Sequence, residues 1–329
     1  MRVRAALAAI FSVVDRFTVA LCVTVLAGSL LPCTGGAALL LDRATNVAVA
    51  ALFFLHGAKL SSAAVRAGAV HWRLHLVVML STFCMFPLLG LALRPLLAPL
   101  VTPQLYVGIL FVCALPSTVQ SSIAFVSIAR GNVPAAVCSA TASSLAGIFL
   151  TPLLVGLLVA QRDAGVVPWQ AIGHIGTQLL APFIAGQIAR RWIGGWIAAH
   201  PAGIKLVDQG SILMVVYGAF GEAVREGLWQ QIPLRSLAGL TVVCVVLLAA
   251  ALLTTRLAAR TLGFNREDEI AILFCGSKKS LASGAPMAKV LFSAAGVGAM
   301  VLPLMLFHQI QLMVCAVIAR RYALDPEEP

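Results

Sequence analysis

The sequence predicts an all-α, polytopic membrane protein of ten transmembrane helices in two inverted five-helix repeats. One observation behind this prediction is composition, because 60% of the 329 residues are hydrophobic and only 11% are charged, whereas about 25% of a soluble domain is charged. A second is that the apolar residues fall in ten runs, most of them near the roughly 20 residues that a helix needs to cross a bilayer. This composition excludes a soluble enzyme, a disordered chain and an ordinary nucleic-acid-binding protein.

The ten runs begin after a short amino-terminal segment. Met1 to Val14 has a basic end followed by apolar residues, but no small-residue cleavage site comes after it, and Asp15-Arg16 interrupts the pattern. We expect a short helix on the cytoplasmic surface rather than a removed signal peptide. The runs must be helical because lipid offers no partner to unpaired backbone groups. The predicted spans are 17–32, 45–61, 75–98, 104–129, 133–159, 168–190, 207–224, 236–256, 267–291 and 297–319.

Lysine and arginine positions set the orientation of these spans. With both termini in the cytoplasm, fifteen of the 23 Lys and Arg residues fall on inner segments and five on outer ones, as expected for basic cytoplasmic loops. The two halves, 1–160 and 161–329, then hold five spans each. An odd number of spans per half inserts the second half upside down, which makes an inverted repeat. We expect a multi-pass protein of the plasma membrane, which in a bacterium is the inner membrane.

The fourth span of each half carries residues that interrupt a helix near its middle. In the first half, Pro116 removes a backbone donor, and Ser117 is placed to cap a new half-helix. In the second half, Gly276 weakens the helix, and Ser277 or Ser280 is placed to cap the half-helix after the break. Paired interruptions of this kind mark transporter binding sites. For the first break, the alternative is that Pro116 only kinks a continuous helix and that the serines hydrogen-bond to backbone carbonyls.

Two adjacent lysines, Lys278 and Lys279, lie at the second break. A lysine near the bilayer centre costs about 2.5–3.5 kcal/mol on insertion scales, so this pair needs a wet cavity, a partner or a lowered pKa. The alternative is that both lysines belong to a surface loop. All twelve acidic residues lie outside the spans or near their ends. Three of them, Glu267, Asp268 and Glu269, stand at the start of the ninth span, where helix capping explains them.

These features define the candidate substrate or ion site and the kind of substrate it suits. The amino-terminal ends of the second half-helices add partial positive charge, which together with the lysines favours an organic anion with a carboxylate, sulfate or phosphate group. Gln178 and His308 are the further polar residues best placed to reach a cavity, and for each the alternative is a hydrogen bond to a neighbouring helix. The candidate site residues are Pro116, Ser117, Thr118, Gln120, Ser121, Ser122, Gln178, Ser277, Lys278, Lys279, Ser280 and His308.

At these residues the chain resembles the bile acid:sodium symporter family. The resemblance covers essentially all ten spans and is strongest from Pro116 to Pro152 and in the ninth span. The stretch from Gly276 to Ala282 resembles the branch that contains bacterial YfeH-like proteins and the orphan seventh human paralogue. The resemblance implies a core bundle and a panel bundle, each drawn from both repeats, with the fourth and ninth helices unwound and crossing in the core.

The chain departs from this family at the sodium ligands. The sodium-coupled members use a Glu-x-x-x-Gln-Asn pattern in the ninth helix, and here Leu273, Ser277 and Lys278 stand at those positions. The family's Ser-Asn pair in the fourth helix falls near Ser121 and Ser122. Sodium coupling is therefore not inherited from the resemblance. We expect the ammonium of Lys278 or Lys279 to take the place of the coupling cation.

The sequence thus predicts a secondary transporter, not an enzyme, that moves a small organic anion by alternating access. Transport is expected to be ion-independent or coupled to protonation of a lysine. No cofactor, metal or nucleic acid is expected, and the partners are the lipid bilayer and the anion, with proton or sodium left open. Two alternatives stay open. One is a non-transporting membrane regulator, for example of ion homeostasis, and the other is a sodium- or proton-coupled symporter with an atypical site.

Overall fold

The structure, a computed structural model, describes residues 16–59, 71–159, 169–225, 227, 230 and 232–324. The side chains of Arg16, Val159, 169–178, Ala294 and Ala295 are not among those described. All regular structure in these ranges is helical, which agrees with the predicted all-α class. The amino-terminal segment that we expected on the cytoplasmic surface lies outside the described residues, so that expectation stays a prediction.

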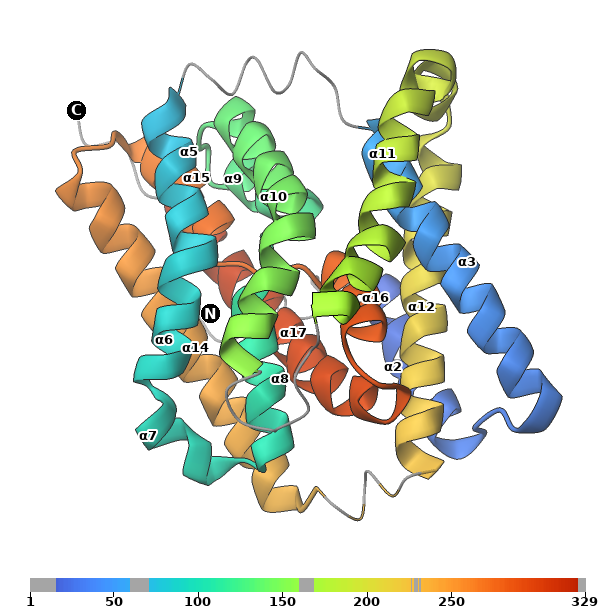
Figure 1. The fold of residues 1–329 in the computed structure, drawn as a ribbon. Coiled ribbons are helices and arrows are strands. Elements are labelled where there is room, and N and C mark those ends of the chain that lie inside the picture. The colour runs from blue at the N-terminus through green and yellow to red at the C-terminus, as the bar shows by residue number, and fades with distance from the viewer. Residues whose placement is uncertain are drawn as a thin grey trace.

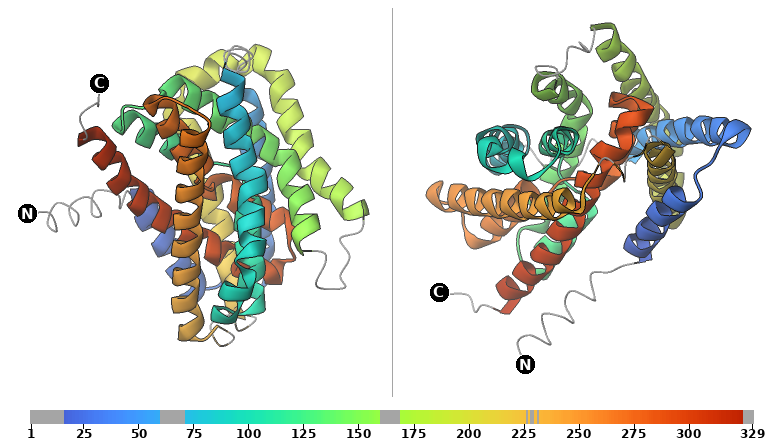
Figure 2. Two further views of the ribbon diagram at one scale, coloured as in Figure 1. Left: turned by 90° about the vertical axis from the view of Figure 1, so that its left-hand side faces the viewer. Right: turned by 90° about the horizontal axis from the view of Figure 1, so that it is seen from below.

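The helices form two groups that lie side by side (Figures 1 and 2). The small bundle contains α2 (Arg16–Leu30), α3 (Gly35–Lys59), α11 (Trp169–Ala199) and α12 (Pro201–Arg225), with α3 packed along α11. α12 also packs against α16 and α17 of the other group. The large bundle contains α5 (Trp72–Leu80), the π-helical turn Ser81–Met85, α6 (Phe86–Ala92), α7 (Arg94–Leu97), a 3-10 turn Ala98–Leu100, α8 (Pro103–Ala114), α9 (Gln120–Ile128), α10 (Val133–Val159), α14 (Leu234–Thr261), α15 (Arg266–Gly276), α16 (Leu281–Leu291) and α17 (Ala294–Leu324).

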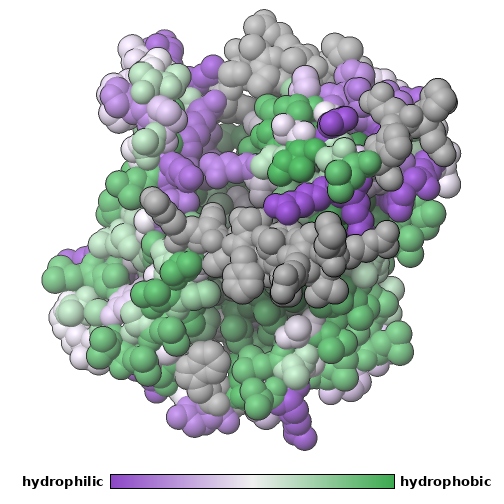
Figure 3. Space-filling view, turned by 180° about the vertical axis from the view of Figure 1, so that it is seen from behind, coloured by the Kyte–Doolittle hydropathy of each residue, from purple (hydrophilic) through white to green (hydrophobic). Residues whose placement is uncertain are grey.

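Several helices have the length and the apolar composition of membrane-spanning helices. Within the described residues, five helical stretches are both long and apolar enough to cross one: Gly35–Lys59, Trp72–Ala92, Val133–Leu158, Leu234–Thr261 and Gly296–Leu324. Apolar side chains cover a broad area in the lower half of the face in Figure 3, and hydrophilic side chains gather in its upper part. An apolar surface of this extent has lipid as its natural solvent.

The second predicted span, 45–61, falls in a helix that begins well before residue 45. α3 already begins at Gly35 and runs through Asp42 and Arg43. The charge of Asp42 is accommodated because its carboxylate accepts hydrogen bonds from Lys289 Nζ at 2.6 Å and from Asn46 Nδ2 at 3.1 Å. The first of these contacts joins α3 of the small bundle to α16 of the large one.

Both predicted helix interruptions are present. α8 ends at Ala114 and α9 begins at Gln120, while α15 ends at Gly276 and α16 begins at Leu281. Pro116 therefore does not kink a continuous helix. Ser280 caps α16, because its Oγ accepts from Ser283 N–H. The capping role predicted for Ser117 is wrong, since α9 starts three residues later, has Val119 at its N-cap position, and leaves the Ser117 hydroxyl to contact another helix.

Small residues allow α3 and α11 to approach each other closely, and this contact yields a stability prediction. A Cβ atom added to Gly186 would lie 1.9 Å from Phe54 O, and one added to Gly57 would lie 2.1 Å from Phe183 O. Gly186→Ala must separate two helix backbones, so we expect it to lower the free energy of unfolding by about 1–3 kcal/mol. Thermal unfolding in detergent measures this. Gly195→Ala on the same helix meets nothing within 4 Å and serves as the control, and equal melting temperatures for the two variants would contradict the prediction.

Candidate functional site

The two breaks lie directly against each other inside the large bundle. Ser280 N–H donates to Pro116 O at 2.9 Å, and Ser117 Oγ donates to Cys275 O at 2.6 Å. Ser122 Oγ donates to Phe274 O at 3.0 Å. Hydrogen bonds thus join the unwound segment between α8 and α9 to the one between α15 and α16, and the interrupted helices meet at their midpoints.

The last carbonyls of α15 show why hydroxyl residues stand at this point. A helix end leaves its final C=O groups without intrahelical partners, and a buried carbonyl without a partner is destabilising. Here Ser122 and Ser117 satisfy Phe274 O and Cys275 O, and Ser277 Oγ donates back to Leu273 O at 2.5 Å. Three serines from two segments therefore close this helix end.

The carbonyl end of α8 is closed by a lysine. Lys279 Nζ donates to Cys113 O at 2.8 Å and to Leu115 O at 2.7 Å, while Thr151 Oγ1 donates to Ala114 O at 2.8 Å. A third hydrogen bond runs from Lys279 Nζ to Thr82 O at 2.7 Å. Three carbonyl acceptors match the three N–H groups of an ammonium ion, so this geometry suits a fully hydrogen-bonded lysine ammonium at the crossing.

The Thr82 carbonyl is available because the helix around it is irregular. Residues Ser81–Met85 form a π-helical turn, in which Phe86 N–H donates to Ser81 O. The next residue is Pro87, which has no N–H to donate to Thr82 O. The carbonyl is therefore left to Lys279. Phe86 adds a second contact, because the centroid of its ring lies 4.2 Å from Lys279 Nζ, a distance that suits a cation–π interaction.

α17 holds the backbone of the same lysine in place. Lys279 N–H donates to Gln311 Oε1 at 2.9 Å, and Gln311 Nε2 donates to Lys279 O at 2.8 Å. His308 lies next to this clamp, with its Nδ1 2.9 Å from Gln311 Nε2. The unwound segment before α16 is thus fixed from both sides, by its own side chain and by α17.

Lys278 has a different environment from Lys279, although both side chains are 0% exposed. Lys278 Nζ donates to Ser121 Oγ at 2.7 Å and lies 4.2 Å from the centre of the Phe125 ring. Ser121 Oγ in turn donates to Thr118 Oγ1 at 3.0 Å. Ser121 is the one hydrogen-bond partner of the Lys278 amine within the described part of the chain, so the two lysines are not equivalent.

The structure brings together ten of the twelve predicted site residues: Pro116, Ser117, Thr118, Ser121, Ser122, Ser277, Lys278, Lys279, Ser280 and His308. Both lysines are buried in the large bundle rather than placed in a surface loop. Gln120 lies at the start of α9 with an exposed side chain, apart from this network in the described structure. The Gln178 side chain lies outside the described residues.

Four residues that are not among the predicted site residues also hydrogen-bond to the two breaks. Thr82 supplies a carbonyl, Gln311 clamps Lys279, Thr151 satisfies Ala114 O, and Ser143 Oγ accepts from Ser117 N–H at 3.0 Å. Pro87 signals an unpaired carbonyl one turn earlier, which in a regular α-helix would be that of Phe83. The π-helical turn moves this role to Thr82, and no sequence signal predicted that turn. Among the described residues, no group of three or more His, Cys, Asp or Glu side chains is arranged to hold a metal ion.

Comparison with known proteins gives consistent similarities over nearly the whole length. A profile of the SBF-like CPA transporter family matches residues 15–324. The chain is 63% identical to an uncharacterized protein of Pseudomonas aeruginosa, over 94% of this chain and 93% of that protein. It is 52% identical to YfeH of Escherichia coli, which is provisionally named as a symporter, over 97% and 96% of the two chains. It is 29% identical to sodium/bile acid cotransporter 7 of the mouse, over 83% and 81%.

Proposed function

The chain belongs to the SBF-like CPA transporter family, and from this premise we propose that it carries a small organic anion across the membrane by alternating access, without sodium coupling. The family and the names of its relatives make it a transporter of the bile acid:sodium symporter type and not an enzyme. The substrate class and the absence of sodium coupling are our own inferences, and both start from the two lysines.

The observation that carries the proposal is the ammonium of Lys279 among three carbonyl oxygens. Carbonyl oxygens at the ends of broken helices are groups that coordinate sodium in transporters with such helices. Here Lys279 Nζ lies 2.7–2.8 Å from two carbonyl oxygens at the end of α8, those of Cys113 and Leu115, and 2.7 Å from Thr82 O in the π-helical turn. An ammonium is a compact point charge, so it supplies the same positive charge without an ion from solution.

An anionic substrate is favoured by the charges around the crossing. Lys278 and Lys279 are buried there, and the described carboxylates that make ion pairs do so elsewhere, at Asp42, Asp208, Glu222 and Glu269. The amino-terminal end of α16 adds partial positive charge near Ser280. We assign the transported anion to Lys278, because the hydrogen bonds of Lys279 are already complete.

Alternating access requires two bodies that move relative to each other, and the two bundles are suited to this. In our proposal the large bundle is the core and the small bundle is the panel. Ten spans are built from α2, α3, α5–α7, α8–α9, α10, α11, α12, α14, α15–α16 and α17, with the inverted repeats in 1–160 and 161–329 and both termini in the cytoplasm. Contacts between the bundles include Asp42 with Lys289 and Thr18 with Gln309, which have to break for the bundles to separate.

Flux through the purified protein in liposomes tests the proposal. A screen of carboxylates, sulfates and phosphates for thermal stabilisation first identifies a ligand, and uptake of that ligand is then compared in sodium and in choline buffers. We expect equal rates in the two buffers. Strict dependence on sodium would favour a sodium symporter with an atypical site, and collapse of uptake by a protonophore would indicate proton coupling. A stabilising ligand that shows no flux in any buffer would favour the non-transporting regulator.

A further inference from the structure

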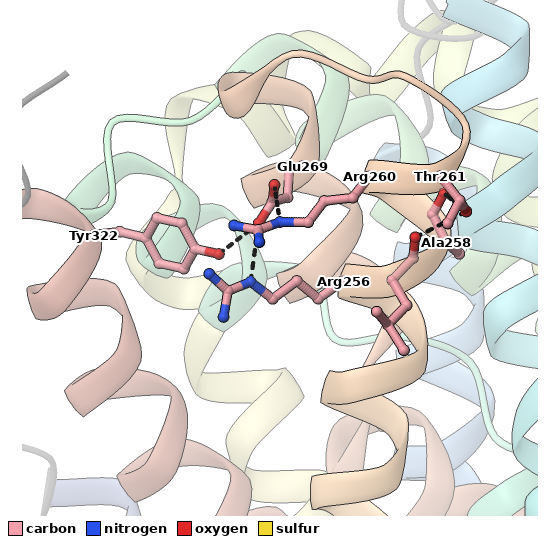
Figure 4. Close-up of polar contacts among 7 residues, drawn as sticks. Arg256, Ala258, Arg260, Thr261, Glu269 and Tyr322 are labelled. Carbon is pink, nitrogen blue, oxygen red and sulfur yellow. Dashed lines mark hydrogen bonds and ion pairs between the residues drawn. The ribbon is translucent and has the colours of Figure 1, made fainter. Parts of the chain in front are cut away.

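Glu269 lies at the centre of a polar cluster at one end of the large bundle (Figure 4). Its carboxylate accepts hydrogen bonds from Arg256 Nε at 3.2 Å, from Arg260 Nε at 3.0 Å and from Tyr322 OH at 2.8 Å. These donors come from α14 and α17, whereas Glu269 stands in the first turn of α15. Its place in the first turn agrees with the predicted preference of carboxylates for a helix start. The N-cap hydrogen bond itself comes from Asn265, which accepts from Asp268 N–H, so the Glu269 carboxylate is left to bind other helices. Its role is to join three helix ends.

The two arginines retain binding capacity after pairing with Glu269. Each contacts the carboxylate through Nε, and within the described part of the chain no hydrogen bond engages the Nη atoms of either residue. Two guanidinium charges face one carboxylate, which leaves an excess of positive charge. The side chains are 48% and 56% exposed, so the outer edges of both guanidinium groups are open to a ligand. Because Nε is fixed, these edges are held in position rather than free to rotate.

The surroundings of the arginines indicate where such a ligand would come from. Leu253 and Leu257 share the outward face of α14 with Arg256 and Arg260, and their side chains are 59% and 51% exposed. In a membrane-spanning helix, exposed leucines of this kind contact acyl chains. Along α14, Arg256 lies one turn beyond Leu253 and directly before Leu257, and Arg260 lies one turn beyond Arg256. This order places the arginines at the boundary between acyl chains and lipid headgroups, where basic residues bind anionic phosphates.

We propose that Arg256 and Arg260 form a binding site for the phosphodiester group of an anionic phospholipid. The guanidinium edges bind the phosphate oxygens, for which a planar fork of donors is well suited, and the acyl chains pack on Leu253 and Leu257. Since Glu269 and Tyr322 hold the arginines, a bound lipid strengthens the junction of α14, α15 and α17. The inference rests on the chain being a membrane protein and is independent of its substrate.

Binding of phosphatidylglycerol to the delipidated, full-length protein tests the proposal. Native mass spectrometry compares phosphatidylglycerol with phosphatidylcholine for the wild type and for the double variant Arg256→Gln/Arg260→Gln. We expect the wild type to prefer phosphatidylglycerol, and the double variant to lose about tenfold to thirtyfold in affinity, because each arginine near the surface contributes about a factor of five. Equal binding of the two lipids by the wild type would overturn the proposal, as would an unchanged preference in the double variant.

Three further variants separate a specific site from general effects of charge and folding. Arg190→Gln/Arg191→Gln removes the same charge from α11 and is expected to change the affinity at most about twofold, so an equal loss there would overturn the proposal. Tyr322→Phe removes one bond to Glu269 without a change of charge and should keep the lipid preference. Arg256→Lys/Arg260→Lys keeps both charges and should retain most of the binding. If the glutamine pair does not fold, the single substitutions are each expected to lose about fivefold, and no loss in either would overturn the proposal.

Discussion

Lys279→Met is expected to lower the free energy of unfolding by about 3 kcal/mol or more, the largest effect that we expect from a single substitution in this chain. The substitution leaves three buried carbonyls, those of Thr82, Cys113 and Leu115, without their common donor, and each unsatisfied buried group costs about 1–3 kcal/mol. Thermal unfolding of the purified protein in detergent measures the loss. Lys205→Met is the matched control, because it removes an exposed lysine from α12. Equal melting temperatures for the two variants would contradict the assigned role of Lys279.

Replacing Lys279 by a smaller residue tests whether its ammonium takes the place of a metal ion. Lys279→Ala leaves the carbonyl oxygens around a space that a hard cation suits. We expect sodium chloride to raise the melting temperature of this variant more than choline chloride does, whereas the two salts should act alike on the wild type. If sodium does not stabilise Lys279→Ala, the lysine closes a helix end but does not replace a cation.

Lys278→Met, unlike Lys279→Met, is expected to leave the free energy of unfolding nearly unchanged. We expect it instead to decrease the flux of the transported anion by about tenfold or more. Among the described residues, the Lys278 amine has one hydrogen-bond partner, Ser121, and it also lies over the ring of Phe125. Replacing a poorly partnered buried charge by an apolar side chain of similar size is often neutral or stabilising. A charge-assisted hydrogen bond to the substrate contributes about 1.5–3 kcal/mol, which corresponds to at least a tenfold effect.

The measurements for Lys278→Met are the same melting curve and the liposome flux assay. Ser121→Ala serves as its companion, because it removes the partner of the amine and keeps the charge, so the anion should still be transported. A drop in melting temperature as large as that of Lys279→Met would show that both lysines have a structural role, and the assignment of the anion to Lys278 would then be wrong.

Much of this site could be read from residue types along the chain. Pro116 and Gly276 marked the two breaks, and the adjacent lysines marked the crossing as the place where charge is buried. The sequence did not show which hydrogen-bond partner each of these side chains would find. Ser117 was expected to cap the helix after it, but its hydroxyl donates to Cys275 O, 158 residues away in sequence. A capping pattern is local, whereas the competing acceptor comes from another part of the chain.

The hydrogen-bond partners of Glu269, at one end of the large bundle, could not be predicted from the sequence either. Its position in the first turn of a helix explained it from the sequence, yet its partners are Arg256, Arg260 and Tyr322 on two other helices. The charges of these residues were visible in the sequence, but their convergence on one carboxylate was not. It depends on which helix ends pack together.

The amino-acid sequence by itself determined that this protein is helical, that it suits a membrane, and that its helices break at Pro116 and near Gly276. These properties arise from composition and from the local chemistry of proline and glycine, which act within one helical turn. Only the tertiary structure decided that Lys279 closes the end of α8 with three hydrogen bonds, while the Lys278 amine makes one, to Ser121, among the described residues. The two neighbouring lysines differ because the role of a buried ammonium depends on which carbonyls surround it. Those of Thr82, Cys113 and Leu115 contact Lys279 from helices that are far away in the sequence.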